Sequence, residues 1–132
     1  VGLMDGTIDA VCSDHAPVDE DAKLLPFVES EAGATCLELL LSLVLKWAEE
    51  MKIPLAEAVA KITSEPARIL GVEAGHLSIG ATADLCIFDP DQYWRVEAQT
   101  LKSQGKNTPF LGIELQGKVK YTLVDGIIVY ED

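Results

Sequence analysis

The pattern of apolar and polar positions divides the chain into three zones, the first of which runs to about Gly33. Residues 8–13 are short, largely apolar and bounded by polar positions, which is typical of a buried strand in a parallel sheet. Pro17 ends this strand, because proline lacks a backbone N–H and disfavours helix at the residue before it. Residues 18–33 have no regular period, and an irregular segment of that length is usually a functional loop or disordered.

The second zone is predicted to be helical. Residues 35–51 are apolar on nearly all sides, which predicts a helix that is buried over most of its surface. Pro54 suits the first turn of a second helix, which we expect to run through Ile62. A third, short helix is expected over residues 65–71, with Ser64 as its N-cap and a terminal glycine.

The third zone has the pattern of β-structure. Residues 84–88 and 93–96 predict two strands, which are separated by an Asp-Pro pair. Three more strands are expected near the end of the chain, at 115–119, 121–124 and 127–130. The Asp125-Gly126 pair between the last two is a strong signal for a hairpin turn.

Length and composition indicate a folded piece of protein. The chain has 132 residues, of which 48% are hydrophobic, and this is enough for one domain with a core. A complete (β/α)₈ barrel needs roughly 200 to 250 residues, so the chain is too short to be one. It begins at Val1 without a methionine or a targeting segment, which we interpret as a truncated start.

The charge balance narrows the range of partners. With 22 acidic and 10 basic residues the formal net charge is −12, which argues against nucleic acid and against anionic membranes as partners. The apolar run at 39–45 is far shorter than the ~20 residues of a membrane span. Cys12, Cys36 and Cys86 lie far apart among apolar neighbours, so we expect reduced, buried cysteines of a cytoplasmic protein.

The sharpest candidate for chemistry is Asp14 in the run Ser13-Asp14-His15-Ala16-Pro17. An acidic residue at the end of a buried parallel strand occupies the place where α/β barrels carry catalytic groups. By itself the Asp-His pair is a weak signal, because aspartate also begins turns.

The order of several motifs along the chain resembles the dihydroorotases. The matches at the presumed end of the barrel are Asp14 to Pro17, Lys23, Pro26-Phe27, Gly33 and Leu37-Glu38. Those in the rest of the chain are residues 66–71, 80–89, 107–110 and 124–126. The pattern at 80–89 is by itself typical of the wider amidohydrolase superfamily, which includes hydantoinases and allantoinases.

This resemblance implies an α/β fold in which the chain supplies only part of the whole. Residues 1–71 are expected to hold the last β/α unit of a (β/α)₈ amidohydrolase barrel with trailing helices, and residues 72–132 a small C-terminal β domain. Without a neighbouring strand the predicted strand has no lateral partner, so we expect a further segment to complete the fold or the chain to self-associate as a homo-oligomer.

The resemblance also implies a zinc-dependent hydrolase of pyrimidine biosynthesis that interconverts dihydroorotate and carbamoyl aspartate. In this family the aspartate that matches Asp14 contacts the zinc site and acts first as general base and then as general acid. The backbone of Ala32 and Gly33 matches the loop that binds the substrate ring, and His15 is expected near the substrate. The chain alone is expected to be inactive.

Two departures from the family pattern leave alternatives open. The other family zinc ligands, namely a His-x-His pair, a carboxylated lysine and two histidines, lie upstream, and His76 is interpreted as a surface residue. Val18 stands where active dihydroorotases carry a histidine for the substrate carboxylate, and losing such a contact costs roughly 1.5 to 3 kcal/mol. This feature resembles inactive homologues that scaffold aspartate carbamoyltransferase. A hydantoinase or an allantoinase is the other alternative.

Overall fold

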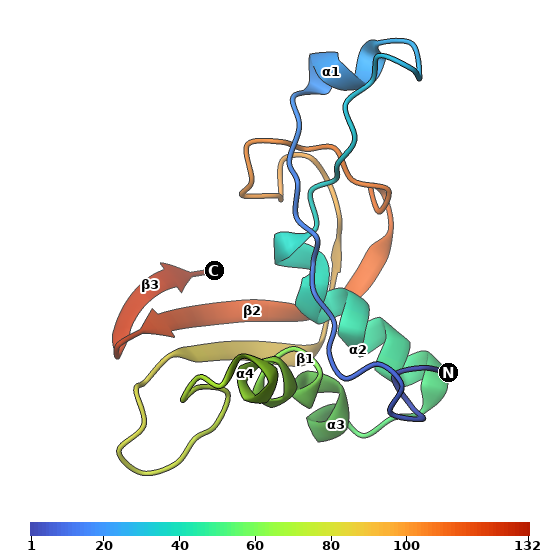
Figure 1. The fold of residues 1–132 in the computed structure, drawn as a ribbon. Coiled ribbons are helices and arrows are strands. Elements are labelled where there is room, and N and C mark those ends of the chain that lie inside the picture. Colours follow the sequence, from blue (N-terminus) through green and yellow to red (C-terminus); the bar gives the residue numbers. More distant parts are fainter.

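A three-stranded antiparallel sheet forms one side of the computed structural model, which describes residues 1–132 (Figure 1). The strands are β1 (Leu85–Arg95), β2 (Glu114–Val124) and β3 (Ile127–Glu131), in the order β1-β2-β3. The helices are α1 (Glu20–Leu24), α2 (Leu40–Met51), α3 (Leu55–Ala60) and α4 (Ser64–Leu70), and a 3₁₀ turn η1 (Leu37–Leu39) precedes α2. Helix α2 contacts both β2 and α3, and so joins the helical zone to the sheet.

The predicted hairpin is confirmed. Asp125 and Gly126 have φ values of 50° and 77°, and a tight two-residue turn between twisted strands requires positive φ at both positions. The strands predicted at 84–88 and 93–96 instead form the single strand β1, whose pairing with β2 shifts between Asp89 and Tyr93. The irregularity includes a proline, which has no N–H to donate to the neighbouring strand.

Strand β2 likewise joins the two segments that were predicted at 115–119 and 121–124. Lys120, between them, is part of the same continuous strand, and its neighbours on both sides pair with β1. The half-buried Lys120 does not interrupt the strand, and a charged residue alone is therefore a poor signal for the end of a strand.

Helix α2 begins at Leu40, later than the predicted start at residue 35. The reason is tertiary, because the backbone N–H of Thr35 donates to the carbonyl oxygen of Asn107 at 2.6 Å. Ser64 is the first residue of α4, and Thr63 stands at the N-cap position without a capping bond. The Thr63 hydroxyl donates instead to the Val59 carbonyl oxygen at 2.8 Å. The predicted glycine terminator of α4 is confirmed, since Gly71 has a φ of 67°.

The predicted strand at 8–13 is wrong as a paired element of this structure, where those residues form no β ladder. The N–H of Val11 donates to the carbonyl oxygen of Lys61 at 2.9 Å, so this segment lies beside the helical zone. A strand needs a neighbouring strand to accept its hydrogen bonds, and the three strands of the chain pair only with one another. The predicted loop at 18–33 contains the short helix α1.

One hydrophobic core joins the helical zone to the β zone. Leu39 packs with Val96, Leu101 and Leu115, and each of the four is at most 3% exposed. A second cluster lies between α2 and α3 and consists of Val44, Ala48 and Ala58.

Only 13 of the 132 residues are buried, and many large apolar side chains therefore remain at the surface. The expectation of buried cysteines is wrong for Cys12 and Cys86, which are exposed, while Cys36 is half-buried. Most of their apolar neighbours in the sequence, such as Val11 and Leu85, are only half-buried, so the local pattern overstated the burial of the cysteines. No helix in the structure has the length and apolar character that crossing a membrane requires.

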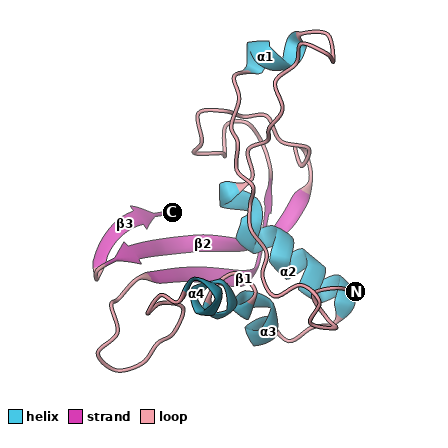
Figure 2. Cartoon of the chain, viewed as in Figure 1, coloured by secondary structure: helices cyan, strands magenta, loops and turns pink.

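Two long loops project from the same end of the molecule (Figure 2). One covers residues 12–36 and carries α1 at its tip, and the other covers residues 96–113 between β1 and β2. Hydrogen bonds join these loops, and the candidate site residues lie on the first of them.

Candidate functional site

Asp14 lies at the turn where the unpaired segment enters the first long loop. Its backbone has a φ of 45°, in the left-handed region, and its side chain is exposed. Aspartate tolerates this conformation better than most residues, yet left-handed backbone costs roughly 1 to 2 kcal/mol. Residues in such conformations cluster at functional sites, and the surrounding loop must hold them in place.

His15 anchors the loop to the start of the helix. The backbone N–H groups of Cys36 and Leu37 both donate to its Nδ1, at 3.1 Å each. These N–H groups belong to the first turn of a helix, where intrahelical acceptors are absent. Because Nδ1 accepts both bonds, the proton of a neutral imidazole is on Nε2, and this N–H is the one available to a ligand.

Gly33 brings the two arms of the loop into close contact. The N–H of Ala16 donates to the Ala34 carbonyl oxygen at 3.0 Å, so residues 14–18 and 32–36 run beside each other. Gly33 has a φ of 135°, and a Cβ at this position would collide with the carbonyl oxygen of Ala16. It would also lie 3.3 Å from Cγ2 of Val18. Close approach to the opposite arm, and not the start of a helix, therefore requires glycine here. Ala32, beside it, is exposed.

The second long loop crosses both arms. The side-chain amide of Asn107 donates to the carbonyl oxygen of Gly33 at 3.0 Å. The Thr35 hydroxyl donates to the carbonyl oxygen of Gly105 at 2.5 Å, and Thr35 is fully buried. These bonds connect residues that are about seventy positions apart in the sequence.

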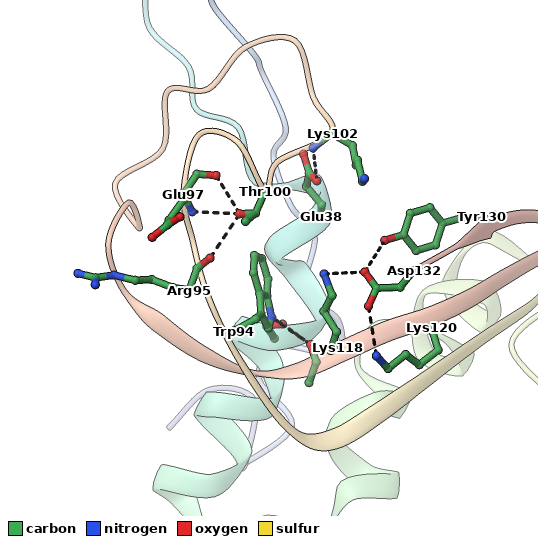
Figure 3. A network of polar contacts seen from close by, with 12 residues as sticks. Glu38, Trp94, Arg95, Glu97, Thr100, Lys102, Lys118, Lys120, Tyr130 and Asp132 are labelled. Atoms are coloured by element: carbon green, nitrogen blue, oxygen red, sulfur yellow. Dashed lines mark hydrogen bonds and ion pairs between the residues drawn. The ribbon is translucent and has the colours of Figure 1, made fainter.

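Glu38 fixes the base of the second loop. Its carboxylate accepts hydrogen bonds from the backbone N–H groups of Lys102 and Ser103, each at 2.7 Å (Figure 3). Bonds of this kind to an ionised acceptor are shorter and stronger than bonds between neutral groups. Glu38 precedes α2, so the carboxylate ties this loop directly to the helix that carries the core.

A polar network continues from this point across the sheet (Figure 3). Trp94 donates from Nε1 to the Ser42 hydroxyl at 3.1 Å, and Asp132 pairs with Lys118 at 3.1 Å and with Lys120 at 3.2 Å. These lysine hydrogen bonds, that of Lys118 first, lower the pKa of the Asp132 carboxyl below its usual value. A pocket of about 250 Å³ opens beside the network.

The family of the chain follows from comparison with protein-family models. A family model described as the amidohydrolase family matches residues 43–130. The chain belongs to the amidohydrolase family.

Similarity to individual proteins confirms the resemblance to dihydroorotases. The amidohydrolase chain is 45% identical over 130 residues to a dihydroorotase of Citrifermentans bemidjiense, covering 98% of this chain and 31% of that relative. It is 42% identical over 128 residues to a dihydroorotase-like protein of Pseudomonas putida, covering 97% and 30% respectively. The chain thus spans less than a third of the length of the curated relatives it matches.

Solved structures support the fold. The chain superposes on dihydropyrimidinase from Brevibacillus agri with a TM-score of 0.91 and 25% identity, covering 98% of this chain and 30% of that one. The mixed arrangement of helices and sheet is therefore that of a fragment of a hydantoinase-like amidohydrolase.

The donor groups of this amidohydrolase chain do not hold a metal ion by themselves. No three His, Cys, Asp or Glu side chains lie together as a ligand group, whereas a catalytic zinc usually takes three protein ligands. Nδ1 of His15 is already engaged by the backbone, and Asp14 alone offers a single carboxylate. His76 lies in the loop after α4, where its Nε2 is 3.9 Å from a Glu73 carboxylate oxygen.

Sequence reasoning missed the role of three residues. Thr35 and Asn107 join the two long loops and Glu38 joins the second loop to the start of α2, and the sequence analysis gave none of them a function. The available signal was that Glu38 and Asn107 belong to motifs shared with dihydroorotases. Their partners are far apart in the sequence, so only the folded chain reveals the contacts.

Proposed function

We propose that the whole protein is a dihydroorotase that interconverts dihydroorotate and carbamoyl aspartate. The observation that carries this proposal is the 45% identity to a dihydroorotase over nearly the whole chain, a stretch that includes Asp14 and both arms of its loop. The exposed carboxylate on a left-handed residue supports Asp14 as the reacting group.

Asp14 would first accept a proton and then donate it again during hydrolysis. In hydrolysis, water adds to the carbonyl carbon of the cyclic amide while Asp14 accepts a proton from it. The carboxylic acid then returns the proton to the ring nitrogen as the C–N bond breaks, so the carboxylate is regenerated. Such acid–base catalysis contributes about 10²- to 10⁴-fold in rate.

Zinc is part of the proposal only for the whole protein. There we assign Asp14 as one contact of the metal site, with the other ligands outside this chain. A bound zinc ion lowers the pKa of its water to about 7, which supplies a nucleophile at neutral pH.

We propose that the backbone of Ala32 and Gly33 binds the substrate ring by hydrogen bonds. The Gly33 carbonyl oxygen already accepts a bond from Asn107, so the N–H groups of this segment are the ones assigned to the substrate. His15 would donate from Nε2, because its Nδ1 accepts two backbone bonds.

The finer description of the fold also belongs to this proposal. Residues 1–71 would contribute the last β/α unit and trailing helices of a (β/α)₈ barrel, and residues 72–132 a small β domain. A homo-oligomer and a cytoplasmic location stay predictions.

Val18 favours a second candidate function. A valine provides no charge or hydrogen bond for a substrate carboxylate, so a non-catalytic homologue that scaffolds aspartate carbamoyltransferase is the alternative. A hydantoinase is the alternative substrate class, in line with the structural similarity to a dihydropyrimidinase.

The test is made on the whole protein, by metal analysis together with dihydroorotate turnover. Stoichiometric zinc and a loss of at least about 100-fold in kcat for Asp14→Ala would support the enzyme. Asp19→Ala is the matched control, because it removes an exposed carboxylate from the same loop and should leave kcat unchanged. Absence of both metal and turnover in the wild type would exclude the enzyme and favour the scaffold.

A further inference from the structure

The segment Gly105–Asn107 of the second long loop contacts both arms of the Asp14 loop. On the Gly33 arm it makes three hydrogen bonds. Asn107 donates from its side chain to the Gly33 carbonyl oxygen at 3.0 Å and accepts at its own carbonyl from the Thr35 N–H at 2.6 Å. Gly105 accepts from the Thr35 hydroxyl at 2.5 Å.

On the Asp14 arm the contact is one of close packing. A Cβ added at Gly105 would lie 2.8 Å from Cβ of Pro17 and 3.0 Å from the carbonyl oxygen of Val18. Contacts under 3.0 Å force a neighbour to move. The backbone of Gly105 thus lies directly against the residues that follow Asp14 and His15, and only glycine fits there without displacement.

The segment itself is anchored through the residues that precede it in the loop. Glu38 accepts the N–H groups of Lys102 and Ser103, and Lys106 donates from its ammonium group to the Leu101 carbonyl oxygen at 2.7 Å. Leu101 is part of the core with Leu39. The segment is therefore connected to the packed core as well as to the loop on which it acts.

We propose that Asn107 and Gly105 are positioning residues for the site. Asn107 holds the Gly33 arm in place, and Gly105 holds the Pro17–Val18 segment that follows Asp14. This inference rests on the proposed function for its kinetic part. Misplacement of a reacting group by about 1 Å costs on the order of 100-fold in rate, so small shifts of either arm have measurable effects.

Substitutions at the two positions should have different kinetic effects in the whole protein. Asn107→Asp keeps the shape but replaces the donor with a carboxylate that repels the Gly33 carbonyl oxygen, so KM for dihydroorotate should rise about 10-fold while kcat changes less. Gly105→Ala presses on the Asp14 arm, so it should lower kcat by 10-fold or more. A purely structural role would lower thermal stability without separating kcat from KM in this way.

Gln116→Glu is the matched control. Its side-chain amide also donates to a backbone carbonyl, that of Leu45 at 3.4 Å, and it lies on β2 away from the loop. The control should change neither KM nor kcat, whatever it does to the melting temperature.

Hydrogen exchange in peptides 14–18 and 32–37 gives a readout that does not depend on turnover. Both variants should exchange these amides faster than wild type and the control. If the wild type turns over nothing, the proposed function fails, and faster exchange still supports the positioning role. Unchanged exchange in both variants, or unchanged kcat and KM in an active enzyme, would overturn the inference.

Discussion

Leu45 of α2 packs directly on the backbone of Gly117 in β2, so closely that a Cβ at Gly117 would collide with Cδ1 of Leu45. The Ser42 hydroxyl, one turn earlier in α2, donates to the Gly117 carbonyl oxygen at 2.8 Å. This contact joins the helical zone to the sheet that lies beneath the two long loops.

Gly117→Ala should therefore destabilise the protein by about 2 to 4 kcal/mol, because the new methyl group adds a collision to the strain of a positive φ. Gly80→Ala is the matched control, since both glycines have a φ of 88° but nothing lies within 4 Å of a Cβ at Gly80. Urea titration of both variants measures the difference. Equal losses would show that backbone strain alone matters and that the Leu45 contact adds nothing.

Val18→His tests whether this residue limits substrate binding. If a histidine here supplies a charge-assisted contact to the substrate carboxylate, KM for dihydroorotate in the whole protein should fall about 10- to 100-fold. Val28→His places the same side chain on the same loop at a position that is 94% exposed, and it should have no effect. An unchanged KM in Val18→His would mean that the carboxylate is bound elsewhere.

The Asp132 interactions predict a pH dependence of stability. Hydrogen bonds from Lys118 and then Lys120 hold the pKa of this carboxyl below its usual value of about 3.9. A lowered pKa stabilises the fold above the unfolded pKa, and this contribution is lost as pH falls through the lowered value. Asp132→Asn should thus melt below wild type at pH 7, and the gap should close at pH values well below 4.

Glu131→Gln serves as the control for this effect, because it removes the neighbouring carboxylate, which pairs with no lysine in the structure. Its melting temperature should track that of wild type across the same pH range. A gap for Asp132→Asn that persists undiminished at low pH would contradict the ion-pair explanation.

The isolated chain of 132 residues should self-associate. Phe27 is 96% exposed, and further large apolar side chains are uncovered on α1, α4 and β3. Large apolar side chains left uncovered on several elements favour association with other protein. Light scattering coupled to size exclusion measures the molar mass, and a monodisperse monomer that unfolds cooperatively would refute the prediction.

Local patterns determined much of this protein. The Asp125-Gly126 hairpin, the glycine end of α4 and the helix–strand order follow from residues that are neighbours in the chain. The order of motifs from Asp14 to Gly126 was enough to indicate the dihydroorotases, which the comparisons confirm.

Only the tertiary structure decided where α2 begins, that residues 8–13 lie beside the helical zone, and how the site loop is held. Thr35 leaves the helix because its N–H bonds to Asn107, and Gly33 is glycine because the opposite arm lies against it. These contacts join positions that are distant in sequence. Many of them are made by backbone N–H and carbonyl groups, which nearly every residue carries. A sequence pattern reports side-chain periodicity, whereas the partner of a given N–H or carbonyl group is set only when the chain folds.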